Sequence, residues 1–204
     1  MKSKDLTTFY IIRHGETEWN IKKLIQGQKD SPLTENGLKQ AKEIAKELKK
    51  IKFDIIFSSD LLRAKRTAEI IAAEHNLAVE TTKLLRERNF GNYEGKLSKE
   101  IFKAFDQLIN TLTVEQMFRY KENPDVESDE EIATRLITFL RETAISHARK
   151  KILVVTHGGI MKALLIKLGV IGYKKYSWVG NGSYVKLESD GVDFFVKETR
   201  GIEK

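Results

Sequence analysis

Two histidines stand in matching places in the sequence, each just after a short apolar run. His14 follows residues 8–12 and one arginine, and His157 follows residues 152–155 and one threonine. A glycine comes directly after each histidine, and glycine lets the backbone approach a ligand closely. Near neutral pH, imidazole serves as a nucleophile, a general acid or base, or a metal ligand. The repeated pattern predicts that both histidines belong to one chemical site.

A shared site requires the two apolar runs to be neighbouring parallel strands. The first run is rich in β-branched and aromatic residues, and the run at 152–155 is wholly apolar, which is typical of a central strand. In open α/β sheets, ligands bind beyond the carboxyl ends of the strands. The remaining histidines, His75 and His147, do not follow strands, so we expect no catalytic role for them.

The rest of the chain alternates between predicted strands and helices. Apolar residues at helical spacing predict helices that begin after Thr34, over 61–72, after Ser128 and after His157. Further strands are expected at 51–57 and 78–81, with 58–60 as a turn, and a hairpin is expected at 183–187 and 194–197. This alternation predicts an α/β fold with a mostly parallel sheet and helices on both faces.

Composition limits the classes of protein to which this chain can belong. Its 204 residues, 41% of them hydrophobic, suit a sizeable core, and we expect 1–204 to form a single domain. Cysteine is absent, which excludes disulfides, thiol catalysis and cysteine-ligated zinc. No apolar run approaches the ~20 residues of a membrane helix, and the polar N-terminus lacks a signal-peptide core. We therefore expect a cytoplasmic protein that does not bind membranes.

The net charge of +7 is spread along the chain, and many lysines share helical stretches with glutamates. That distribution indicates a solvated, charged surface. No nucleic-acid-binding motif accompanies the positive charge, so no nucleic-acid partner is expected.

A metal site is one rival explanation for the paired histidines. Zinc sites usually add a third histidine or a carboxylate at close spacing. This chain has no His-x-x-x-His sequence and no aspartate directly after His157, so we expect no metal and no other cofactor. A serine hydrolase is also poorly supported, because the chain has no Gly-x-Ser-x-Gly sequence.

Five segments, in order, resemble the motifs of one family. Arg13-His14-Gly15-Glu16-Thr17, with Trp19-Asn20, resembles the signature of the histidine phosphatase superfamily, the phosphoglycerate-mutase-like group. The other segments are 31–34 with Gly37 and Gln40-Ala41, 58–64 with Thr67-Ala68, 85–87 with Gly91 and Glu94-Gly95, and 155–159. The resemblance spans nearly the whole chain. It implies a three-layer α/β/α sandwich with a mixed, mostly parallel sheet and a small helical cap, which we expect at 96–128.

The resemblance also implies a role for each matching residue. His14 would attack the phosphorus atom and carry the phosphoryl group, and Glu87 would donate a proton to the leaving oxygen. The residues expected around the phosphate oxygens are Arg13, Arg63, His157 with Gly158, and Asn20, with Gln26 close to them. Arginine forks suit phosphate oxygens, and phosphoryl transfer depends mainly on positioning and charge. A neutral His14 suits a nucleophile, whereas His157 would serve better as a cation.

Some of these residues also have an ordinary structural explanation. Glu87 lies between Arg86 and Arg88 and could form a simple ion pair with them. Gln26 could be a solvated loop amide. The apolar residues of 102–118 could serve the core, the cap or a dimer face. The oligomeric state therefore stays open, with a homodimer among the options.

The sequence predicts an enzyme, a metal-independent phosphomonoesterase that hydrolyses small phosphorylated metabolites through a phosphohistidine on His14. Two alternatives stay open. One is a phosphoglycerate mutase, which Arg88 slightly favours, although mutases carry a longer middle insertion with more basic residues than 96–128. The other is a non-catalytic module that binds phosphorylated ligands. The presence of His14, Glu87 and His157 together argues against such a module.

Overall fold

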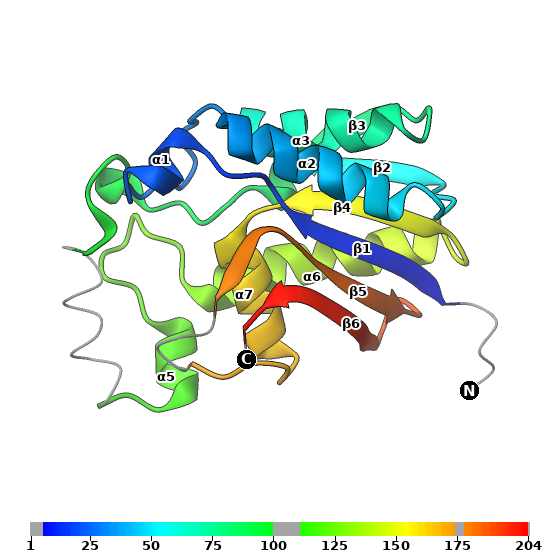
Figure 1. Cartoon of the computed structure of the whole chain (residues 1–204). Helices are drawn as coiled ribbons and strands as arrows, with labels where there is room; N and C mark the ends of the chain where they lie inside the picture. Colours follow the sequence, from blue (N-terminus) through cyan, green and yellow to red (C-terminus); the bar gives the residue numbers. More distant parts are fainter. Residues whose placement is uncertain (1–5, 100–110, 174–177, 204) are drawn as a thin grey trace.

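The computed structural model describes residues 6–99, 111–173 and 178–203, and within them the strands form one sheet between helices (Figure 1). The strands are β1 (Thr7–Arg13), β2 (Ile55–Ser59), β3 (Val79–Thr82), β4 (Lys151–Thr156), β5 (Val179–Ser189) and β6 (Phe194–Ile202). The α-helices are α1 (Glu18–Ile21), α2 (Glu35–Leu48), α3 (Leu62–Ala73), α5 (Val114–Arg119), α6 (Asp129–Ser146) and α7 (Gly158–Lys167). Two short 3₁₀ helices are η1 (Lys83–Leu85) and η2 (Gly91–Tyr93).

The strand order β3-β2-β4-β1-β5-β6 brings the two histidine-bearing strands together. β1 and β4 are parallel, with Ile12 opposite Val155 and Arg13 opposite Thr156, so both strands end at the same level. β2 and β3 continue the parallel part, whereas β5 is antiparallel to β1 and β6 is antiparallel to β5. The prediction of a mixed, mostly parallel sheet is confirmed.

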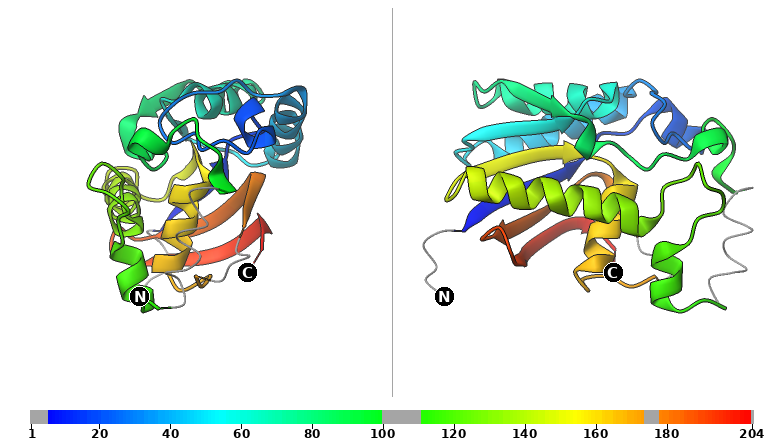
Figure 2. Two further views of the ribbon diagram at one scale, coloured as in Figure 1. Left: turned by 90° about the vertical axis from the view of Figure 1, so that its left-hand side faces the viewer. Right: turned by 180° about the vertical axis from the view of Figure 1, so that it is seen from behind.

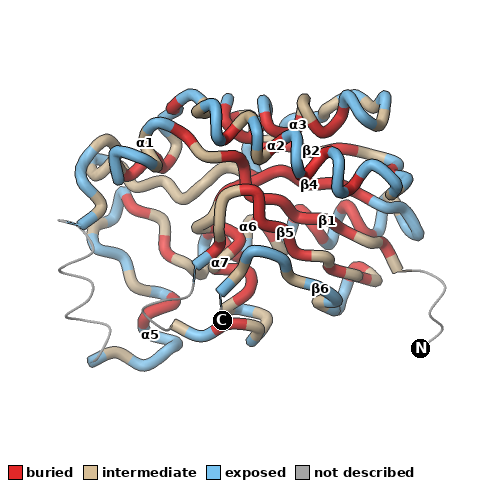
Figure 3. Tube along the Cα trace, viewed as in Figure 1, coloured by how far each residue is buried: buried red, intermediate tan, exposed pale blue. Residues whose placement is uncertain are grey.

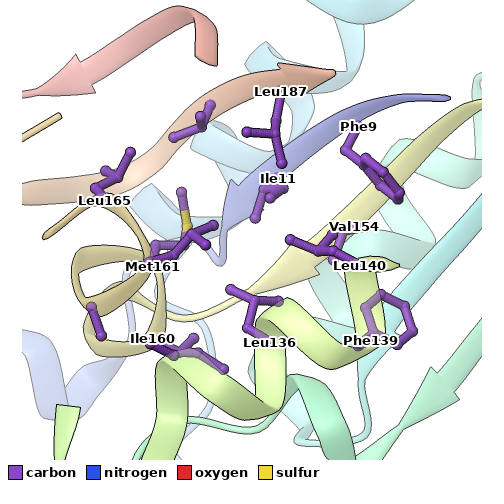
Figure 4. Close-up of a cluster of buried hydrophobic side chains, with 14 of the residues drawn as sticks. Phe9, Ile11, Leu136, Phe139, Leu140, Val154, Ile160, Met161, Leu165 and Leu187 are labelled. Carbon is purple, nitrogen blue, oxygen red and sulfur yellow. The ribbon is translucent and has the colours of Figure 1, made fainter. Parts of the chain in front are cut away.

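Helices cover both faces of this sheet, as the two views in Figure 2 show. Successive residues of a strand point to opposite faces. In β1, Phe9 and Ile11 therefore join the core under α6 and α7, and Tyr10 and Ile12 join the core under α2 and α3. Figure 4 shows the first core, in which Met161 of α7 lies among these side chains. Burial runs along almost the whole of β1 and β4 (Figure 3), and the predicted three-layer sandwich is confirmed.

The second predicted strand is shifted along the chain. It was expected at 51–57, but β2 covers Ile55–Ser59, so that Ser58 and Ser59 are buried strand residues and not a turn. Ser58 Oγ donates a hydrogen bond to Ser59 O (2.9 Å), and Ser59 Oγ accepts one from Leu61 N (3.3 Å). These local hydrogen bonds offset the free-energy cost of burying the two hydroxyl groups.

The predicted cap at 96–128 falls only partly within the described residues, because 100–110 lie outside them. In its described part, Thr113 caps α5, and Met117 and Phe118 are buried where α5 packs on α6. The cap and the single-domain boundaries stay predictions. In the described part of the chain, no helix has the length and apolarity needed to cross a membrane.

Candidate active site

The two strand-end histidines meet beyond the carboxyl ends of β1 and β4. Their ring centroids are 5.1 Å apart, with an interplanar angle of 63°. Both side chains are withdrawn from solvent, since His14 is 3% exposed and His157 is 0% exposed. The predicted pairing of the histidines at one edge of the sheet is therefore confirmed.

A backbone contact assigns the proton on the imidazole of His14. Its Nδ1 lies 2.7 Å from Gly15 O. A carbonyl oxygen only accepts hydrogen bonds, so in the neutral ring Nδ1 carries the hydrogen and Nε2 carries the lone pair. Nε2 is the atom available to attack an electrophile.

The loop that follows the first histidine is fixed by α2 and α3. Glu16 N donates a hydrogen bond to Gln40 Oε1 (2.8 Å), and Gly15 N donates to Thr67 Oγ1 (3.1 Å). A Cβ atom on Gly37 would lie 2.0 Å from Glu16 O, so this approach of α2 to the loop requires glycine. These contacts explain why motif residues from distant segments matter to one loop.

Two buried arginines flank the histidines, Arg13 at the end of β1 and Arg63 in the first turn of α3. Arg63 uses its Nη atoms to donate to Gly27 O (2.7 Å) and Lys29 O (2.8 Å). Arg13 donates from Nη1 to a backbone oxygen of β5. Gly158 lies against Arg13, because a Cβ atom there would be 3.0 Å from Arg13 Nε. Both guanidinium groups are thus held at their Nη ends.

Unpaired buried nitrogens are concentrated at this place. Eight buried side-chain nitrogen or oxygen atoms lack a hydrogen-bond partner in the described part of the chain, and four belong to three site residues. They are Arg13 Nε, Arg63 Nε, and both ring nitrogens of His157. A buried polar group without a partner costs about 1–3 kcal/mol. A group with several oxygen atoms, such as phosphate, could offer partners to all three side chains.

Glu87 faces the start of α7, where backbone N–H groups hold its carboxyl group. Oε2 accepts from Gly159 N (2.8 Å), and Oε1 accepts from Arg88 N (2.8 Å) and Ile160 N (3.1 Å). A Cβ atom on Gly159 would lie 2.5 Å from Oε1, so the second glycine after His157 makes room for the carboxyl group. Three backbone donors leave this side chain little freedom to turn.

The simple ion pair considered for Glu87 is not present. Arg86 pairs with Asp60 (2.6 Å between Nη2 and Oδ2), and Arg88 pairs with Asp129. The charge of Glu87 instead acts on the two site arginines, where it raises the pKa of each and partly offsets the effect of burial. Glu87 therefore belongs electrostatically to the histidine site.

Burial lowers the pKa of both site histidines well below the usual 6.5. After burial, the positive charges of Arg63 and Arg13 lower the pKa of His14, and Arg63, His14 and Arg13 lower that of His157. Both rings are neutral at pH 7, which suits His14 but differs from the cation expected at His157. The negative charge of a bound phosphate would raise the pKa of His157 again. Burial lowers the pKa of Arg13 to about 10, so this guanidinium stays charged at pH 7.

These shifts can be measured by ¹⁵N NMR of the four histidine side chains. In the free protein at pH 6.5, we expect neutral imidazole for His14 and His157, with the proton of His14 on Nδ1. The reason is that a lowered pKa delays protonation until the pH is below 6.5. The variants His14→Gln and His157→Gln assign the signals. Saturating vanadate should move the titration of His157 to higher pH, and a protonated His14 at pH 6.5 in the free protein would refute this electrostatic picture.

Comparison with known protein families identifies the family to which this chain belongs. The model of the histidine phosphatase superfamily (branch 1) matches residues 9–200. The chain belongs to the histidine phosphatase superfamily. The family resemblance predicted from the five motifs is confirmed.

Relatives in this superfamily bear the names of both phosphatases and mutases. A metal-independent phosphoserine phosphatase of Arabidopsis thaliana is 35% identical over 80% of this chain and 69% of its own. A probable phosphoglycerate mutase, GpmB, of Yersinia pestis (strain Pestoides F) is 37% identical over 89% of this chain and 92% of its own. The mycobacterial glucosyl-3-phosphoglycerate phosphatase Rv2419c, solved with VO3, is 26% identical, with a TM-score of 0.79 over 94% of this chain and 97% of that one.

Two further residues implied by the superfamily, Asn20 and Gln26, come shortly after the signature. Asn20 lies in α1, where its Oδ1 accepts from Thr17 N (3.1 Å) and completes the helix cap. Gln26 is 9% exposed, and its Oε1 has no partner among the described residues, so it is not a solvated loop amide. None of the contacts of the described residues joins Gln26 to either site histidine, and its role stays a prediction.

Sequence reasoning missed Asn181, which contacts both the histidine loop and α1. Its Nδ2 donates to His14 O (3.1 Å) and lies 3.3 Å from Asn20 Oδ1. The available signal was its place between Gly180 and Gly182, next to a predicted strand. Glycines at such a place favour a bulge that can aim a side chain at a site.

Within the described residues, no group of three or more histidine, aspartate or glutamate side chains is arranged to hold a metal ion. Glu87, the carboxylate whose charge acts on Arg13 and Arg63, accepts hydrogen bonds from three backbone donors.

Proposed function

We propose that this member of the superfamily hydrolyses phosphomonoesters of small metabolites, without a metal, through a phosphohistidine on Nε2 of His14. One observation carries the proposal. A neutral imidazole with a free Nε2 lies beside buried, unpaired nitrogens of Arg13, Arg63 and His157. A nucleophile next to cationic donors is the arrangement that phosphoryl transfer needs, because the reaction depends on positioning and on charge stabilisation.

In the first step, Nε2 of His14 bonds to phosphorus while the bond from phosphorus to the ester oxygen breaks. The departing oxygen takes a proton from Glu87, which the start of α7 holds in place. Arg13 and Arg63 offset the charge on the transferring oxygens. His157 joins them as a hydrogen-bond donor, and as a cation once the phosphate has raised its pKa.

In the second step, a water oxygen bonds to phosphorus and the bond from Nε2 to phosphorus breaks. Glu87 accepts a proton from that water, which restores the carboxylic acid, and inorganic phosphate leaves. His14 returns to its neutral form with the proton on Nδ1, where the contact with Gly15 O requires a donor. Division into two steps replaces one difficult displacement with two easier ones.

The alternative of a phosphoglycerate mutase rests on the relative that bears this name. A mutase must keep water from the phosphohistidine until it returns the phosphoryl group to substrate. Arg88, the residue that favoured this alternative, is engaged with Asp129 in the structure. We therefore favour hydrolysis over transfer.

The deciding experiment measures phosphate release and isomerisation side by side in excess EDTA. We expect turnover of p-nitrophenyl phosphate and of at least one phosphomonoester from a panel that includes phosphoserine, because the proposed site needs no metal. With 3-phosphoglycerate and a trace of 2,3-bisphosphoglycerate, we expect little 2-phosphoglycerate. Both inorganic phosphate and 2-phosphoglycerate are followed over time.

Three outcomes would count against this proposal. Isomerisation much faster than phosphate release from any substrate would favour the mutase. Loss of activity in EDTA, restored by a divalent ion, would contradict metal independence. Binding of phosphate esters without turnover of any would favour the non-catalytic module.

A further inference from the structure

β5 reaches the end of β1 through a large irregularity in its pairing with β6. Along β5 the pairing passes from Val179 to Tyr184, while along β6 it passes only from Ile202 to Arg200. Inside this bulge, Gly182 has a φ of +69°, a conformation that glycine adopts without strain. The regular ladder between β1 and β5 ends with Ile12 opposite Tyr184. Figure 1 shows β5 curving as it passes the end of β1, and a bulge of this kind re-aims side chains.

Asn181, within this bulge, bridges two parts of the site. Its Nδ2 donates to the backbone oxygen of His14 (3.1 Å), the proposed nucleophile. The same Nδ2 lies 3.3 Å from Oδ1 of Asn20 in α1. A primary amide has two hydrogens to donate, so one Asn181 side chain can serve both acceptors.

The contacts of Asn20 show what this bridge achieves. Besides Asn181, its Oδ1 accepts from Thr17 N (3.1 Å) and Thr17 Oγ1 (3.0 Å). Donors on one oxygen fix which end of the amide is oxygen and which is nitrogen. The Nδ2 of Asn20 has no hydrogen-bond partner among the described residues. The Asn20 amide is therefore turned so that its own two hydrogens are available to another acceptor.

The neighbours of Asn181 in β5 act on a third site residue. Val179 O accepts a hydrogen bond from Nη1 of Arg13, and the Trp178 ring lies 5.0 Å from the guanidinium carbon of Arg13. Residues 178–181 thus contact the proposed nucleophile His14, the side-chain amide of Asn20 and the buried Arg13. They come from the opposite end of the sequence to all three.

From these contacts we propose that Asn181 is a positioning residue for phosphoryl transfer. It orients the Asn20 amide as a donor to a phosphate oxygen and holds the backbone of His14 at the distance that attack requires. The inference rests on the proposed function of His14. Asn181 acts through Asn20 and His14 and needs no contact with the substrate.

A double-mutant cycle tests the part that acts through Asn20. The variants are Asn181→Ala, Asn20→Ala and the double variant, and the readouts are the single-turnover rate of His14 phosphorylation and the affinity for vanadate. Asn181→Ala should slow phosphorylation by about 10- to 100-fold, because small displacements at a reacting centre are costly. The double variant should lose much less than the product of the two single losses, since residues in one network are not additive.

Tyr184→Phe is the matched control in the same strand. It removes the hydrogen bond from the Tyr184 hydroxyl to Glu198 Oε1 (2.6 Å), which is not part of the site. This variant should phosphorylate His14 and bind vanadate as the unmodified protein does. Melting temperatures of all variants are recorded, and Asn181→Asp, which keeps the shape but cannot donate, replaces Asn181→Ala in the cycle if the latter does not fold. Asn181→Asp should show the same non-additivity.

The outcomes separate this inference from the function on which it rests. If the unmodified protein forms no phosphohistidine, both fail. If the unmodified protein forms phosphohistidine and Asn181→Ala matches Tyr184→Phe in rate and vanadate affinity, only the role of Asn181 fails. If the loss of rate in the double variant equals the product of the two single losses, the action of Asn181 through Asn20 is overturned as well.

Discussion

His14→Ala is expected to lower the turnover of phosphomonoesters by at least ~10⁴-fold, because it removes the atom that would form the covalent intermediate. The structure gives this side chain a neutral ring whose Nε2 is unprotonated. After incubation with a radiolabelled substrate, the His14→Ala variant should carry no acid-labile, alkali-stable phosphoryl group. A rapid quench in alkaline detergent, followed by denaturing electrophoresis at alkaline pH, measures the label, and phosphate release measures the turnover.

His147→Ala provides the control with the same change of residue type. His147 is the C-cap of α6, and its ring contacts Ser146 Oγ (2.9 Å), away from the site. It should keep full turnover and full labelling. Near-normal turnover in His14→Ala would end the phosphohistidine mechanism, and retained labelling there would move the nucleophile to another residue.

The meeting of His14 and His157 could be predicted because it follows from strand ends. When two apolar runs form neighbouring parallel strands, the residues that follow them lie at the same edge of the sheet. The register of Ile12 with Val155 shows this arrangement. The helices after Thr34 and Ser128 could also be predicted, since each begins with a hydroxyl residue whose side chain caps a backbone N–H three residues later. Each of these signals lies within a few consecutive residues of the sequence.

The environment of Glu87 could not be read from the sequence in the same way. Its neighbours in sequence, Arg86 and Arg88, suggested an ion pair, but their charges are used by Asp60 and Asp129. Two of the three backbone N–H groups that hold Glu87 come from the start of α7, about seventy positions later. Only the folded chain decides which of several nearby charges forms the pair.

The protonation of His157 shows a further limit of inference from residue type. The prediction of a cation took into account only the charge of a bound phosphate. In the structure His157 is also completely buried, and burial together with the charges of Arg63 and Arg13 lowers its pKa. Asn181 was missed for a related reason. Its role depends on a bulge that brings 178–181 back to β1, and the two glycines signal the bulge but not its target.

Glu87→Gln is expected to produce a loss that depends on the leaving group of the substrate. Gln keeps the shape of the side chain but cannot donate a carboxylic acid proton. An alkyl phosphate releases a strongly basic alkoxide unless it is protonated, so phosphorylation of His14 by such substrates should slow by about 10²- to 10⁴-fold. p-Nitrophenyl phosphate has a weakly basic leaving group and should slow by less than about 10-fold in the same step. Single-turnover measurements with both substrates isolate phosphorylation from the later hydrolysis.

The contacts at α7 suggest a second variant that tests the same role without removing the carboxyl group. Gly159→Ala would place a Cβ atom 2.5 Å from Glu87 Oε1 and must displace that side chain. It should show the same selective loss on alkyl phosphates. Glu43→Gln, at an exposed pair with Lys39 on α2, is the control and should change neither rate. Equal losses on alkyl and aryl substrates in Glu87→Gln would mean that Glu87 places the site residues, as its charge on Arg13 and Arg63 allows, and does not supply the proton.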